Sequence, residues 1–180
     1  TVDIIKKIIE TDCSKIYRVK FDQTIISGNL EIKKYFQKKM IMKKTVDNYF
    51  QLESDIIRRL EHENIITIVY SNYNSYIMEC CDTSLEDIIY HNIRYPLQLR
   101  IKFMTRIINA VRYMHTKGFV HMDLKPTNIL IGLDLEPKII DFDRTITQQY
   151  SGFAHIGTFD YLPYEYFTGN SIFNNFITDD

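Results

Sequence analysis

Apolar and polar residues alternate over most of the first 44 residues, which predicts β-strands. The alternation is seen in the runs IIKKIIE, KIYRVKF, TIISGNLEIKKYF and KKMIMKK. A helix is predicted from about residue 47 to residue 60, with Asp47 or Asn48 as its N-cap. Two further strand-like runs follow, at 65–70 and 75–80. This part of the chain therefore reads as strand-rich.

Beyond the acidic stretch 82–87 the periodicity becomes helical. Apolar residues recur at three- and four-residue steps, which predicts a long buried helix that Lys117-Gly118 ends. These residues are Leu97, Ile101, Met104, Ile107, Ile108, Val111 and Met114. We therefore predict an α+β fold with two lobes, a β-rich lobe over 1–80 and a helical, incomplete lobe over 85–180, joined by a hinge at 81–84.

Composition narrows the class of protein. The 180 residues carry 22 Lys plus Arg and 23 Asp plus Glu, a formal charge of −1, so a nucleic-acid binder is not expected. Hydrophobic residues at 45% and charged residues at 25% indicate a globular chain. Three cysteines, two of them adjacent, favour a reducing, cytoplasmic setting over a disulfide framework. No apolar run approaches the roughly 20 residues that span a bilayer, and the abundance of isoleucine favours a low-GC source such as a large DNA virus.

The strongest local inference comes from residues 121–143, HMDLKPTNILIGLDLEPKIIDFD. Two short apolar runs, 129–131 and 138–140, flank a polar turn and predict an antiparallel hairpin. With residue 129 opposite residue 140, Asn128 would lie opposite Asp141. Hard oxygen ligands of this kind suit Mg²⁺. The alternative is that Asp and Asn serve here as ordinary turn formers.

A second polar group is predicted between the strand KKMIMKK and the helix after it. Alternation places Ile41 and Lys43 on one face of the strand. Glu53 falls on the apolar stripe of the helix, where a carboxylate needs a cationic partner, and Lys43 is the nearby candidate. The alternative is a Glu53 at the edge of the stripe, in solvent.

Taken together, these segments resemble the eukaryotic-type protein kinases, in the order and spacing of that family from about residue 5 to residue 180. MIMK at 40–43 stands where the family has VAIK, and Glu53 stands where its first large helix supplies the partner of the lysine. LEHENII resembles the loop after that helix, and YIMECC resembles the gatekeeper and hinge. HMDLKPTN resembles HRDLKxxN, DFD resembles DFG, and GTFDYLPYE resembles GTxxYxAPE.

The resemblance implies a role for each matching residue of the catalytic loop. Asp123 would accept the proton of the substrate hydroxyl, and Lys125 would balance charge at the transferring phosphoryl group. Asn128 and Asp141 would hold Mg²⁺. Lys125 and Thr158 resemble the Ser/Thr-specific branch of the family.

The resemblance also implies an ATP site. Lys43, paired with Glu53, would hold the α- and β-phosphates. The adenine would be met by the backbone of Glu79 and Cys81. The side chains implied around it are Ile16, Ile41, Leu130 and the gatekeeper Met78.

Several positions depart from the family. Ile9, Thr11 and Ser14 occupy the glycine positions of the phosphate loop, where side chains hinder approach to phosphate. Ile41 replaces a small alanine, Met122 replaces the arginine that receives an activation-loop phosphate, and Asp143 replaces the DFG glycine.

These departures leave two hypotheses open. One is an ATP- and Mg²⁺-dependent protein serine/threonine kinase. The other is a pseudokinase that serves as a protein-binding or regulatory module. The expected partner is a protein substrate or a regulatory protein, with no nucleic acid and no membrane. The sequence stops where the family begins the central helix of its larger lobe, so it is expected to be either a fragment or a minimal kinase-like domain that needs a partner. If the 180 residues are the whole protein, we expect the helix near 96–115 to expose apolar surface that a partner or a second copy covers.

Overall fold

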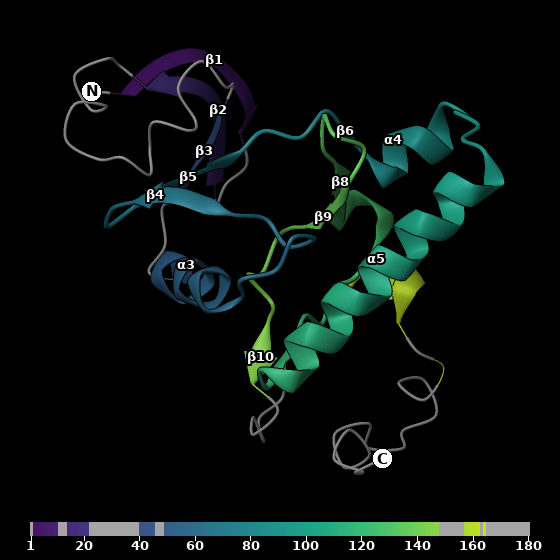
Figure 1. The fold of residues 1–180 in the computed structure, drawn as a ribbon. Helices are drawn as coiled ribbons and strands as arrows, with labels where there is room; N and C mark the ends of the chain where they lie inside the picture. The colour runs from purple at the N-terminus through teal and green to yellow at the C-terminus, as the bar shows by residue number, and fades with distance from the viewer. Residues whose placement is uncertain are drawn as a thin grey trace. The chain divides into compact units, whose positions relative to one another are not determined.

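The computed structural model describes residues 2–10, 14–21, 40–45, 49–147, 157–162 and 164. The chain divides into two compact units. The first comprises 1–61 and 66–81, and the second comprises 62–65 and 82–180. Residues 62–65 thus belong to the second unit although residues of the first unit lie on both sides of them in sequence. Each unit is described by itself (Figure 1).

The first unit is built on a five-stranded antiparallel sheet in the order β1-β2-β3-β5-β4. The strands are β1 (Val2–Glu10), β2 (Ser14–Phe21), β3 (Met40–Thr45), β4 (Ile68–Ser71) and β5 (Ser75–Glu79). The strand expected at 24–36 lies outside the described residues. The strand expected at 65–70 begins later, because Ile65 forms an isolated bridge with Ile139 instead.

The register of the sheet gives its two faces different characters. Met40 lies in a buried cluster with Val19 and Ile77, and Met42 packs against that cluster. Lys43 is opposite Ile16 on one side and Tyr76 on the other, so these residues lie on the other face. The predicted separation of Met40 and Met42 from Ile41 and Lys43 is confirmed.

Helix α3 (Tyr49–Arg59) lies beside β4 (Figure 1). Its length agrees with the helix predicted over 47–60, of which residues 47 and 48 lie outside the described residues. The buried apolar side chains described on the helix and at its end are Ile56, Ile57 and Leu60, spaced as an amphipathic helix requires. Glu53 is buried on the same helix, on the stripe rather than at its edge.

The second unit contains α4 (Leu85–Tyr90) and the long α5 (Leu97–Thr116). A capping box between Ser84 and Asp87 begins α4. Gly118, at φ +79°, follows the end of α5 and donates its N–H to the His115 carbonyl at 2.9 Å, as the sequence predicts. Within the described ranges, neither these helices nor α3 combines the length and apolar character that crossing a membrane requires.

The buried stripe predicted on α5 is only partly right. Ile107 and Met114 are buried, together with Phe103 and Ala110. Four of the predicted core residues are more than half exposed, because the described elements cover only one side of the helix. These are Leu97, Ile101, Met104 and Ile108.

Short strands complete the second unit. β6 (Thr83–Ser84), β8 (Ile129–Ile131) and β9 (Pro137–Ile139) form one sheet, and β7 (Phe119–Val120) pairs with β10 (Ile146–Thr147). A 3-10 turn, η1 (Pro126–Asn128), precedes β8, and a second, η2 (Phe159–Tyr161), follows residue 158.

The predicted register of the β8–β9 hairpin is wrong by one residue. Ile129 is opposite Ile139, and the N–H of Ile140 donates to the Asn128 carbonyl at 3.0 Å. Asn128 is therefore aligned with Ile140, and Asp141 lies one position farther along. The observed register buries Ile129 and Ile139 together, whereas a one-residue slip would turn one of them to the opposite face.

Candidate active site

The first unit holds a buried ion pair between β3 and α3. Lys43 Nζ lies 2.9 Å from Glu53 Oε1, and the two side chains are 12% and 3% exposed. The hydroxyl of Tyr76 donates to the same Glu53 oxygen at 3.1 Å. Tyr76 reaches it because it sits directly opposite Lys43 in the sheet. The pairing expected from the burial of Glu53 is thus present, and Tyr76 is a further member that helical periodicity could not reveal.

The face of the sheet that carries Lys43 also carries the side chains expected to surround an adenine. Ile16 is opposite Lys43, and Ile41 lies between Arg18 and the gatekeeper position Met78. These side chains are buried or half-buried. The register therefore groups Ile16, Ile41, Lys43 and Met78 on one surface of the first unit.

The structure also describes the other residues that were expected to contact the adenine, but that contact stays a prediction. Glu79 ends β5 and donates its N–H to the Thr67 carbonyl at 3.4 Å. The Cys81 carbonyl accepts a hydrogen bond from the Cys80 thiol at 3.4 Å. Leu130 belongs to the second unit, where it is half-buried in β8.

The second unit holds the catalytic-loop residues on the segment between β7 and β8. Asp123 is 5% exposed, and Lys125 Nζ donates to its Oδ2 at 2.8 Å. Asn128 donates its Nδ2 to the Asp123 backbone carbonyl at 2.9 Å. The amide of Asn128 is used in this way to fold the loop back on itself, so that Asp123, Lys125 and Asn128 are held together.

Thr158, from a distant part of the sequence, contacts both Asp123 and Lys125. Its hydroxyl accepts from Lys125 Nζ at 2.6 Å and donates to Asp123 Oδ1 at 2.7 Å. Asp123, Lys125 and Thr158 thus form a triangle of charge-assisted hydrogen bonds. Thr158 was expected only to mark the Ser/Thr branch, and its match to GTxxY was the signal that could have placed it at the site.

The environment of Asp123 favours its ionised form. Burial by itself raises the pKa of a carboxyl group, but the hydrogen bonds from Lys125 and Thr158 outweigh it here, and the pKa of Asp123 lies below its ordinary value. The nearby charges of Lys125 and Arg144 act in the same direction. The carboxylate is therefore available as a proton acceptor near neutral pH.

His121 holds the catalytic loop in place through hydrogen bonds. Its Nε2 is 2.9 Å from the Ile140 carbonyl, and its Nδ1 accepts from the backbone N–H of Asp123 at 3.3 Å. The ring lies 5.0 Å from that of Phe142, which is fully buried. Burial lowers the pKa of His121, which favours the neutral ring, and the ring bridges the catalytic loop to Ile140, the residue between β9 and Asp141.

Asn128 and Asp141 each have a side-chain oxygen that could bind a divalent cation. Because the Asn128 Nδ2 donates to Asp123, its Oδ1 is left as the atom that can face a metal, apart from a 3.5 Å contact with the Thr127 hydroxyl. Asp141 directly follows Ile140, which donates its N–H to the backbone carbonyl of Asn128. The φ of Asp141 is +66°, so the chain turns at this residue. No group of three or more His, Cys, Asp or Glu side chains within the described ranges could hold a metal. Two oxygen ligands are what Mg²⁺ needs when phosphate and water complete its shell.

The described residues that depart from the kinase motifs differ in their exposure to solvent. Ile9 is half-exposed in β1 and Ser14 begins β2, whereas Thr11 lies outside the described residues. Met122 is half-buried with φ +67°, and Asp143 is exposed. A side chain at position 143 is thus accommodated at the surface of the second unit.

Comparison with known proteins identifies the family of this chain. The chain matches the protein kinase domain over residues 10–175. It therefore belongs to the protein kinase family, whose members phosphorylate proteins and typically use ATP and Mg²⁺.

Similar proteins include protein kinases of plants and fungi. The chain is 26% identical over 174 residues to serine/threonine-protein kinase AtPK1/AtPK6 of Arabidopsis thaliana, covering 93% of this chain and 37% of that protein. It is 26% identical over 162 residues to an Aurora kinase of Schizosaccharomyces pombe, covering 86% and 44%. It is 30% identical over 143 residues to 3-phosphoinositide-dependent protein kinase 1 of Arabidopsis thaliana, covering 77% and 28%. The chain thus spans less than half the length of each of these relatives.

Proposed function

We propose that this chain carries the catalytic residues of an ATP- and Mg²⁺-dependent protein serine/threonine kinase. The observation that supports this most directly is the Asp123–Lys125–Thr158 triangle, with hydrogen bonds of 2.6–2.8 Å. A triangle that holds one ionised carboxylate beside one ammonium is suited to receiving a proton from a hydroxyl while negative charge develops nearby.

In the proposed reaction the hydroxyl oxygen of a serine or threonine forms a bond to the γ-phosphorus of ATP as the bond from that phosphorus to the β,γ-bridging oxygen breaks. Asp123 takes the proton of the hydroxyl on a carboxylate oxygen. Lys125, 2.8 Å from that carboxylate, places a positive charge beside the transferring group. The products are the phosphorylated side chain and ADP, and no other reactant is needed.

The other polar residues would bind rather than react. Asn128 and Asp141 would hold Mg²⁺, which supplies charge neutralisation at the phosphates when it is bound. Lys43 would contact the α- and β-phosphates, with Glu53 and Tyr76 fixing the direction of its side chain. Ile16, Ile41 and Met78 would line the adenine, in keeping with their shared face.

A pseudokinase is the second candidate function. Two positions favour it: Ile41 adds volume on the face that carries Lys43, and Asp143 adds a carboxylate two residues after Asp141. A protein of this kind would use the fold to bind a regulatory partner without transferring phosphate. The intact Lys43–Glu53 pair and the Asp123 triangle favour the kinase.

The deciding experiment is phosphoryl transfer from radiolabelled ATP to a mixed protein substrate by the full-length protein. Asp123→Asn is the matched control, because it keeps the size of the side chain and removes its basicity. Transfer that disappears in the variant supports the kinase. Equal or absent transfer in both proteins favours the pseudokinase.

Calorimetry separates nucleotide binding from transfer. We expect Asp141→Asn and Lys43→Ala each to weaken Mg·ATP binding. Unchanged affinity in both variants would contradict the nucleotide site proposed here.

A further inference from the structure

Arg144 joins two described segments of the second unit that lie 13 positions apart in sequence. Its Nη1 donates a hydrogen bond to the Gly157 carbonyl at 3.0 Å. The backbone from which Arg144 extends is itself held, because the next residue, Thr145, is buried and donates its N–H to the Phe142 carbonyl at 3.1 Å. Strand β10 begins directly after Thr145 and pairs with β7, which leads into the catalytic loop. The bond therefore ties Gly157 to a fixed part of the unit.

Gly157 lies directly against the backbone of the catalytic loop. A Cβ atom at this position would lie 2.8 Å from the Met122 carbonyl oxygen, so a larger residue could not pack here unless the backbone moved. The φ of Gly157 is +28°, which also favours glycine. The residues that follow these two are Asp123 and Thr158. The contact therefore brings the threonine beside the carboxylate to which it donates.

The same glycine introduces conformational freedom next to Thr158. Glycine has the widest choice of φ and ψ, so its own backbone does not fix the residue that follows it. The Gly157 carbonyl belongs to the planar peptide that links the two residues, and a hydrogen bond to that carbonyl fixes the direction of the peptide. Thr158 has to be held closely, because its one hydroxyl serves both Lys125 and Asp123, at 2.6 and 2.7 Å.

We propose that Arg144 is a positioning residue, which holds the Gly157 carbonyl and thereby keeps the Thr158 hydroxyl in place. The threonine in turn orients Asp123 and Lys125. The inference rests on the proposed function, in which those two residues act on the substrate hydroxyl. An arginine suits this role, because its donors lie in a rigid plane, whereas a lysine carries a single ammonium on a flexible stem. Arg144 lies one residue after DFD and outside the motifs that matched the kinase pattern.

A double-mutant cycle with Thr158→Val tests the path of the effect. Arg144→Met removes the donor and keeps an apolar stem. We expect kcat with a peptide substrate to fall about tenfold, while the KM for Mg·ATP stays within about twofold. In the Thr158→Val background the same change should lower kcat by less than about twofold, because the hydroxyl that Arg144 positions is already absent. Arg144→Lys keeps a charged donor and should recover part of the loss.

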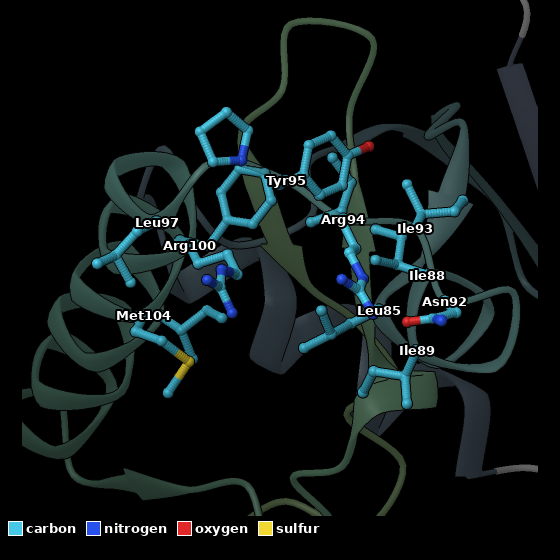
Figure 2. Close-up of a pocket in the computed structure, with 14 residues that line it drawn as sticks. Leu85, Ile88, Ile89, Asn92, Ile93, Arg94, Tyr95, Leu97, Arg100 and Met104 are labelled. Atoms are coloured by element: carbon cyan, nitrogen blue, oxygen red, sulfur yellow. The ribbon is translucent and has the colours of Figure 1, made fainter.

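The matched control is Arg100→Met, at another exposed arginine of the second unit. Figure 2 shows Arg100 on α5, among the side chains that line a pocket beside α4. Neither the catalytic loop 121–128 nor Gly157 and Thr158 belong to the lining of that pocket. We therefore expect Arg100→Met to keep the wild-type kcat in both backgrounds.

Backbone NMR of the full-length protein tests the restraint without depending on phosphoryl transfer. In the wild type we expect the amides of Gly157 and Thr158 to have order parameters of about 0.85, as in rigid backbone. In Arg144→Met they should fall below about 0.6, and in Arg100→Met they should not change.

Two outcomes would overturn the proposal. One is unchanged order at both amides in Arg144→Met, whether or not the protein transfers phosphate. The other is an equal fall of kcat in both backgrounds, which would mean that Arg144 acts through its charge or on the fold and not through Thr158. A wild type that transfers no phosphate, with order lost in Arg144→Met, would contradict the proposed kinase and still support the positioning of Thr158 by Arg144.

Discussion

Thr158 and Asp123 are 35 positions apart in sequence and are joined by a 2.7 Å hydrogen bond between the threonine hydroxyl and the carboxylate. The same hydroxyl accepts a bond from Lys125 at 2.6 Å. Thr158 therefore orients both of the charged groups proposed to act on the substrate. A residue from beyond the last strand of the second unit thus completes the catalytic loop.

Replacing Thr158 should lower phosphoryl transfer. Thr158→Val removes the hydroxyl with little change in volume, and a lost hydrogen bond to a charged group amounts to about 1.5–3 kcal/mol, or roughly tenfold to a hundredfold in rate. The measurement is kcat/KM with a peptide substrate at saturating Mg·ATP. Thr158→Ser keeps the hydroxyl and should retain most of the activity; a serine variant as slow as the valine variant would show that the methyl group matters instead.

Removing Lys43 should destabilise the first unit as well as weaken ATP binding. Lys43→Met leaves the Glu53 carboxylate buried with only the Tyr76 hydroxyl identified beside it, and breaking a buried pair in this way costs about 3 kcal/mol. Urea denaturation measures the change. The double variant Lys43→Met, Glu53→Gln removes the uncompensated charge and should recover part of the loss. A double variant less stable than Lys43→Met alone would contradict this explanation.

Shortening Ile41 should tighten ATP binding. Ile41 shares its face with Lys43 and stands where the VAIK motif that this segment resembles has alanine. Overpacking costs about 1–3 kcal/mol, which is on the order of 5- to 150-fold in affinity. Titration of Ile41→Ala with ATP at fixed Mg²⁺ tests this. Lys44→Ala is the control, since Lys44 is exposed and alternates to the other face. If Ile41→Ala binds no better, the adenine surface already accommodates isoleucine.

Stability should fall below about pH 6.5 through His121. The folded pKa of His121 is below its ordinary value, so the unfolded chain takes up a proton near pH 6.5 while the folded chain does not. Its contribution to stability is therefore constant above that pH and declines as the pH falls, by at most about 1.4 kcal/mol per unit. Denaturation of wild type and His121→Asn between pH 5.5 and about pH 7.5 should show a flatter curve for the variant.

Much of the architecture followed from the sequence because it depends on local periodicity. Alternation in the strand at 40–45 separated Met42 from Lys43, and the stripe of the next helix put Glu53 on the buried side. Burial of that carboxylate then required a nearby cation, which singled out Lys43. Asp123 and Lys125, which we propose to be catalytic, could be singled out because they lie two positions apart in a recognisable motif.

Tertiary structure decided the features that depend on contacts between distant segments. The side-chain Nδ2 of Asn64 donates to the Pro137 carbonyl at 2.9 Å, and the backbone carbonyl of Asn64 accepts from the N–H of Ile139. These contacts, across 73 and 75 positions, help to fix the register of β9. The apolar residues alone left that register ambiguous, since isoleucine faces isoleucine whether Ile129 pairs with Ile139 or with Ile140. Thr158 was likewise placed beside Asp123 by the path of the chain. Periodicity specifies which side of an element is buried, but it carries no information on which distant residue will satisfy a buried polar group there.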